Sequence, residues 1–81
     1  MPDDAAMLAL FGGSSAAVGD SFTFTILNAE TSLSKNCTLT GSDHTFIGNT
    51  IVRNSTPVLS ALFLVRLTNS STGVCTVYRL A

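Results

Sequence analysis

Three adjacent residues, Ser42, Asp43 and His44, carry the side-chain types of a hydrolase triad. In such a triad, the hydroxyl, imidazole and carboxylate groups converge on one another in a defined geometry. Consecutive residues of one short stretch do not converge in that way, because their side chains leave the backbone in different directions. We therefore interpret this stretch as a polar turn. The sequence predicts no catalytic residues and a protein that is not an enzyme.

The remaining residues that bind metals or phosphates are too few or too scattered to form a site. His44 is accompanied by only two cysteines, Cys37 and Cys75, and their spacing does not match a zinc site. The pair Gly12-Gly13 is more typical of a helix end than of a phosphate-binding loop. We expect no metal and no cofactor. The acidic residues all fall at expected loop or helix-cap positions: Asp3, Asp4, Asp20, Glu30 and Asp43.

The two cysteines lie in similar local sequences, NCTLT around Cys37 and VCTVY around Cys75. Two interpretations stay open. The cysteines form a disulfide if their strands are neighbours, which stabilises the fold by about 3–4 kcal/mol in the chain-entropy model. Alternatively, they are two buried thiols that pack as small hydrophobic groups. The second interpretation suits assembly inside a cell, where thiols stay reduced.

Three N-x-[ST] triplets, at Asn36, Asn54 and Asn69, match the acceptor pattern for N-glycosylation. Such triplets arise by chance in a chain rich in Ser and Thr. The N-terminus has acidic residues where a secretory signal peptide carries positive charge. We therefore interpret the triplets as chance matches and Met1 as the start of a piece cut from a longer protein.

The composition combines many hydrophobic residues with few charged ones. Of the 81 residues, 46% are hydrophobic and 11% are charged, against about 25% charged residues in a typical soluble domain. A domain of this size buries only about 60–65% of its unfolded surface. This chain therefore has few charged side chains to place on the surface that stays exposed to water. We infer that copies of the chain pack together and hide part of this surface.

Charge and hydropathy also exclude two classes of partner. The longest apolar run falls between Pro57 and Arg66, far short of the roughly 20 residues that span a bilayer. The formal net charge is −1, and the basic residues do not form the patch that nucleic-acid binding requires. We expect no membrane insertion and no nucleic acid. The basic residues are spread singly along the chain: Lys35, Arg53, Arg66 and Arg79.

The residue pattern predicts an all-β domain after a short helix. Residues 4–11 favour a helix, which Asp3 or Asp4 caps and Gly12-Gly13 ends. Short strands between polar turns are typical of a small antiparallel sandwich or barrel. We divide the chain into a helix-and-loop lead-in at 1–16 and a single β domain at 17–81. The six expected strands lie at 21–28, 36–41, 45–47, 50–54, 58–68 and 74–80.

The expected strand at 58–68 is apolar on both faces. Ala61, Phe63 and Val65 fall on one face, and Leu62 and Leu64 fall on the other. Because a strand in a small soluble domain normally keeps one face in water, we expect the second face to contact other copies. The apolar side of the expected helix is a second candidate contact. The predicted contact residues are Met7, Leu8, Phe11, Leu62, Leu64 and Arg66.

Alternation also predicts where other side chains point. In the first expected strand, Phe22 and Phe24 share one face, and most phenylalanines of the chain fit core positions. Cys37 is expected to point inward. Arg66 interrupts the long apolar strand near its end, and two roles stay open for it. It either extends into solvent, with its stem on apolar neighbours, or pairs with an acidic group such as Asp20.

Three stretches of the chain resemble a known type of module. They are AVGDSFTFTILN, TLTGSDHTFIGNTIV and FLVRLTNSSTGVCTVYRL, and the similarity covers residues 17–80. Together they resemble a small trimerising β module at the C-terminal ends of structural proteins of large DNA viruses and tailed phages. There, the module often follows collagen-like or other repetitive fibre segments.

The resemblance implies a homotrimer that clamps three chains and fixes the register of an upstream shaft. The protein would then belong to a virion surface or fibre, assembled in the host cell, with the second face of the long strand near the symmetry axis. The alternative is a fibre tip domain that binds a host receptor or glycan. Sugar-binding sites favour exposed aromatic side chains, and the sequence has no Trp and a single tyrosine, Tyr78.

Overall fold

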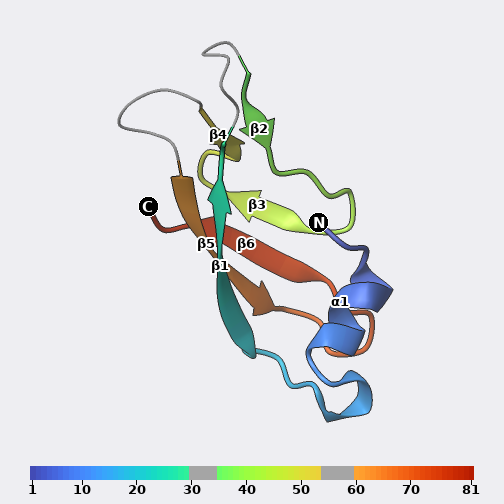
Figure 1. Ribbon diagram of the computed structural model, residues 1–81. Coiled ribbons are helices and arrows are strands. Elements are labelled where there is room, and N and C mark those ends of the chain that lie inside the picture. The colour runs from blue at the N-terminus through green and yellow to red at the C-terminus, as the bar shows by residue number, and fades with distance from the viewer. Residues whose placement is uncertain (30–34, 54–59) are drawn as a thin grey trace.

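The computed structural model describes residues 1–29, 35–53 and 60–81. The fold is mostly β, with a short helix at its N-terminus and six strands in two sheets (Figure 1). It is elongated, with extents of 43 × 19 × 17 Å. In chain order, the elements are α1 Asp4–Leu10, a 3-10 turn at Gly13–Ser15, β1 Ser21–Leu27, β2 Cys37–Thr38, β3 Thr45–Ile47, β4 Ile51–Val52, β5 Ser60–Leu67 and β6 Cys75–Arg79.

The larger sheet has the strand order β1-β5-β6-β3, and β2 pairs with β4 in a separate two-stranded ribbon. Strand β5 lies at the centre, antiparallel to β1 on one side and to β6 on the other. The turn between β5 and β6 is closed by Asn69, whose Oδ1 accepts hydrogen bonds from the amides of Ser71 (2.9 Å) and Thr72 (3.2 Å). The last two strands therefore form an antiparallel hairpin.

The predicted number of strands and the N-terminal helix are confirmed, but the predicted antiparallel pairing is wrong for one strand, and the barrel alternative is wrong. Strand β3 runs parallel to β6, with Thr45 opposite Thr76, and neither sheet closes into a barrel. The reason is that the edge of β6 that faces away from β5 is free to pair. Strand β3, which comes earlier in the chain, pairs with this edge. Alternation marks a strand but does not specify its neighbour.

The helix matches its prediction except at its last residue. Asp3 is the N-cap, and its Oδ1 accepts a hydrogen bond of 2.8 Å from the Ala6 amide. The helix ends at Leu10, one residue early, and Phe11 is its C-cap. Gly12 follows with φ of 105°, a left-handed conformation that glycine adopts without strain. Local capping chemistry therefore sets both ends of α1.

The core lies on one side of the larger sheet, which we call the inner face, and α1 and the β2–β4 ribbon contribute to it. On β5, buried residues alternate with exposed or half-buried ones. One face of the strand therefore packs in the core, and the other does not. Phe63 is the only fully buried phenylalanine among the described residues, whereas Phe22 is 38% exposed. Phe11, Phe24 and Phe46 are partly buried and pack against the core, so the expectation that most phenylalanines are core residues is confirmed, with Phe22 as the exception. The buried hydrophobic residues are Met7, Val52, Ala61, Phe63, Val65, Leu67, Cys75 and Val77.

Strand β2 shows a second difference from the sequence pattern. Cys37 was expected to point inward but is exposed. Its partner Val52, on β4, is fully buried in the core. In the ribbon only β4 reaches the larger sheet, so β2 lies on the outside (Figure 1). An alternating strand with no second layer over it cannot bury its apolar side chains.

Gly73 fixes how closely α1 approaches the β5–β6 turn. Its φ is +91°, and a Cβ at this position would overlap the carbonyl oxygen of Asp4 and lie 2.7 Å from the Cβ of Leu8. The helix backbone therefore rests directly on the glycine. Only a residue without a side chain allows this contact.

We expect Gly73→Ala to lower the free energy of unfolding by at least about 2 kcal/mol, because it combines left-handed strain with a backbone clash. Gly13→Ala is the matched control, since Gly13 also has positive φ (+62°) but nothing lies within 4 Å of its Cβ position. The control should cost about 1 kcal/mol. Urea unfolding of both variants measures the difference. Equal losses would mean that α1 does not rest on Gly73.

Candidate association surface

The side of the larger sheet that faces away from the core carries the second apolar face of β5. We call this side the outer face. The strand registers place Leu62 opposite Thr25, and Leu64 opposite both Thr23 and Tyr78. Aliphatic, aromatic and hydroxyl side chains therefore alternate across neighbouring strands. The outer face comprises Ser21, Thr23, Thr25, Leu27, Thr45, Ile47, Ser60, Leu62, Leu64, Arg66, Thr76 and Tyr78.

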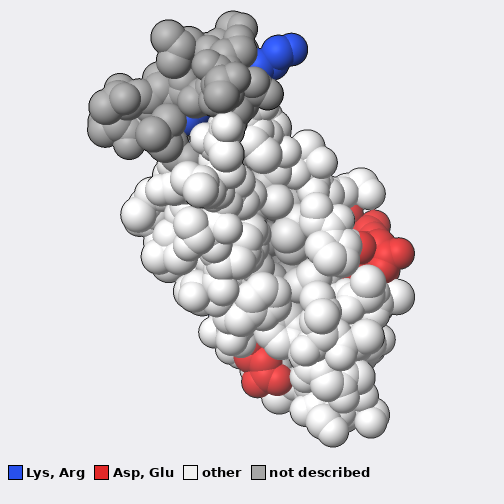
Figure 2. All heavy atoms as spheres, in the orientation of Figure 1, with Lys and Arg blue, Asp and Glu red and all other residues white. Residues whose placement is uncertain are grey.

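The outer face is open, and Arg66 is its only charged residue. Leu62 and Leu64 are half-buried at its middle, whereas Leu27 and Ile47 are exposed by 68% and 51% at its borders. Figure 2 shows how few charges the described surface carries on the side in view, where acidic groups gather at only two places. A pleated surface of this composition suits packing against another sheet at a spacing of about 10 Å.

The three predicted contact residues on the lead-in are engaged within their own subunit. Met7 is buried in the core with 1% of its surface exposed. Leu8 is half-buried, and it lies against Gly73. The Phe11 ring is 5.3 Å from the ring of Phe22. The structure thus separates the six predicted residues into an engaged group on the lead-in and an open group on β5.

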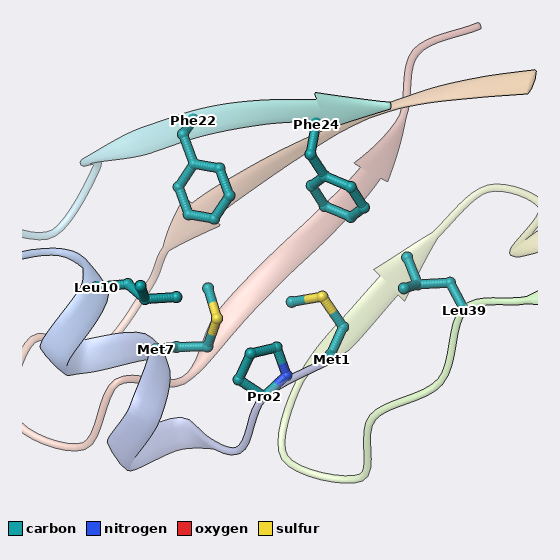
Figure 3. A pocket seen from close by; sticks show the side chains of 7 residues that line it. All are labelled: Met1, Pro2, Met7, Leu10, Phe22, Phe24 and Leu39. Atoms are coloured by element: carbon teal, nitrogen blue, oxygen red, sulfur yellow. The ribbon is translucent and has the colours of Figure 1, made fainter. Parts of the chain in front are cut away.

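An apolar hollow of about 340 Å³ lies on the inner face, between β1 and the lead-in (Figure 3). The rings of Phe22 and Phe24 hang into it from β1, facing side chains from α1 and the first two residues. Leu10 at its rim is 66% exposed. The sequence did not predict this hollow. Alternation shows that a side chain faces the core, but not whether other residues cover that side chain completely. The hollow is lined by Met1, Pro2, Met7, Leu10, Phe22, Phe24 and Leu39.

The two arginines near the sheet have different roles. Arg66 is exposed on the outer face, and the pair with Asp20 is not formed among the described residues. The Asp20 carboxylate instead accepts a hydrogen bond of 2.9 Å from the Ala17 amide. The Nη1 of Arg79 donates to the carbonyl oxygen of Ile51 at 2.7 Å and tethers the ribbon to the larger sheet. Arg66 is the arginine available to a partner.

The residues with triad chemistry are arranged for structure. The Asp43 carboxylate accepts a hydrogen bond from the Asp4 amide at 3.1 Å. The His44 ring is buried and bonds to Pro2 and Cys75, so it does not contact either neighbour in the manner of a triad. In the described part of the chain, no three His, Cys, Asp or Glu residues gather closely enough to hold a metal ion.

The two cysteines are free thiols in contrasting surroundings. Cys37 is exposed, and Cys75 is fully buried at the start of β6. Burial raises the pKa of the Cys75 thiol above its ordinary value, because the thiolate is poorly solvated there. The Cys75 Sγ donates a weak hydrogen bond of 3.3 Å to the carbonyl oxygen of Gly73. Cys75 therefore behaves as a small core residue, and Cys37 does not.

We expect a water-soluble disulfide reagent at about pH 8 to modify Cys37 quickly and Cys75 at least about a hundredfold more slowly, since only the thiolate of an exposed cysteine reacts. Cys37→Ser provides the control, because it leaves Cys75 as the sole thiol. In denaturant this variant should react at the rate of a free thiol. Rapid reaction of folded Cys37→Ser would show that Cys75 is not buried.

Of the three N-x-[ST] triplets, Asn36 and Asn69 are exposed, and Asn54 lies outside the described residues. Among the helices that the structure describes, none has the length and hydropathy needed to cross a membrane.

Comparisons of the chain with protein-family models, with curated proteins and with solved structures found no match.

Proposed function

We propose that this protein is a structural module that joins copies of its own chain, with no chemistry of its own. Following the resemblance of residues 17–80, we propose a homotrimer at the end of a viral fibre or virion surface protein. The module would clamp three polypeptides together and fix their register. The outer face is the observation that carries the proposal.

The position of β5 makes the outer face suited to this role. Because β5 is the central strand, Leu62 and Leu64 lie in the middle of the sheet, with exposed apolar side chains at the borders. Burial of each large apolar side chain contributes about 1.5–3 kcal/mol. Because the patch carries one charge, its burial gains free energy from the leucines and costs little in desolvation of charged groups.

Self-association also suits the composition of the patch. Threonine side chains lie near the leucines, at Thr23, Thr25 and Thr76. They are small enough to pack closely against a partner surface, and hydroxyl groups at the edge of such an interface still bond to water. An identical copy offers the same uncharged surface, and no like charges oppose each other except at Arg66. Closed cyclic symmetry is the usual state of such homo-oligomers.

We expect the wild-type chain to be a trimer at micromolar concentration when its mass is measured by light scattering. Leu64→Asp should convert it to a monomer, because a carboxylate at the centre of the contact would be buried without a partner. Thr25→Asp is a second variant on the same face, and its side chain is exposed, so its effect on folding should be small. Ser70→Asp, in the exposed turn after β5, is the charge-matched control and should remain a trimer.

Far-UV circular dichroism of each variant separates loss of assembly from loss of folding. A wild-type chain that stays monomeric at native pH would contradict the proposed function. If both outer-face variants remain trimers, the copies associate through a different surface, and the assignment of the outer face is wrong.

A further inference from the structure

His44 lies at a junction between the lead-in and the larger sheet. It is only 8% exposed. Its Nε2 lies 2.8 Å from the carbonyl oxygen of Pro2, and its Nδ1 accepts a hydrogen bond of 3.1 Å from the backbone amide of Cys75. One imidazole ring thus connects the second residue of the chain to the start of β6.

The two partners of His44 determine where its proton lies. A backbone amide such as that of Cys75 only donates, so Nδ1 carries no hydrogen. A carbonyl such as that of Pro2 only accepts, so Nε2 carries the hydrogen. Both bonds are satisfied only by the neutral ring in this tautomer.

We propose that His44 is a pH-sensitive latch, whose neutral ring fastens the lead-in to the sheet and whose protonation loosens it. A second proton would lie on Nδ1 and point at the N–H of Cys75, where two hydrogens would face each other. The ring must then turn away from Cys75, and His44 no longer connects the lead-in to β6.

Other titratable groups near the latch do not accept a hydrogen bond from the ring. The Asp43 carboxylate accepts from the Asp4 amide, and the carboxylates of Asp3 and Asp4 accept from the first turn of α1. The Cys75 thiol donates to Gly73, and the Met1 ammonium donates to the carbonyl oxygen of Thr40. Protonated His44 therefore has no direct anionic partner among the described residues.

The lead-in depends on such fastenings because α1 has only seven residues, and isolated helices of this length are marginal in water. The 40–44 loop holds it at three points, through Thr40, Asp43 and His44. Met1, Pro2, Met7 and Leu10 form one wall of the apolar hollow. Loosening the lead-in would therefore widen the hollow and expose Phe22 and Phe24 further.

Hydrogen exchange of the full 81-residue chain tests the latch. The amides of Met7 and Phe11, which bond to Asp3 and Met7, report on α1, and the amide of Val65 reports on the sheet. Between about pH 7 and pH 5, after correction for intrinsic exchange, protection of the α1 amides should fall about tenfold, the factor expected for one lost hydrogen bond. Protection of Val65 should change little.

His44→Gln is the matched control, because its amide oxygen can accept from Cys75 and its NH₂ can donate to Pro2, but it does not titrate in this range. The α1 amides of this variant should keep their protection at pH 5. Equal pH dependence in wild type and His44→Gln, or an equal loss at Val65 in the wild type, would overturn the proposal. So would ¹⁵N chemical shifts that place the proton of the neutral ring on Nδ1.

Discussion

Strand β5 is apolar on both faces, and the described residues supply covering elements for only one of them. The inner face receives α1 and the ribbon, and it holds the buried side chains of Ala61, Phe63, Val65 and Leu67. Within residues 1–29, 35–53 and 60–81, no comparable layer lies over the outer face, and most of its side chains are exposed. This imbalance follows from size, because a small domain has too little chain to enclose a two-sided sheet. The arrangement of the rest of the molecule depends on it.

The inner face is itself covered by a small and weakly attached layer. A row of phenylalanine rings leads from the end of α1 to the centre of the sheet, with centroid distances of 5.3 Å, 6.4 Å and 5.4 Å along Phe11, Phe22, Phe24 and Phe63. Only the last of these rings is fully buried. The short helix is held by backbone contact at Gly73 and by the 40–44 loop, and it leaves the hollow beside β1 open. Surplus apolar surface therefore remains on both sides of the sheet.

Several polar side chains among the described residues join segments that are distant in sequence. His44 connects the N-terminus to β6, Arg79 connects β6 to the ribbon, and the amide group of Asn28 donates to the carbonyl oxygen of Val52. Each of these side chains bonds to a backbone group of a distant segment, as buried polar groups generally do. Among the described residues, His44 and Asp43 thus have structural partners in place of a triad geometry.

The sequence alone determined the features that depend on neighbouring residues. The caps around α1, the strand segments and the alternation on β5 were all predicted, because side-chain period and capping act over a few positions. The mixed pairing of β3 with β6, the exposure of Cys37 and the surroundings of His44 were decided by tertiary structure. Each of them depends on which distant segment comes to lie beside it. The alternation that marks Phe22 as inward-facing likewise carries no information on whether another element covers it, so the hollow became visible only in the folded chain.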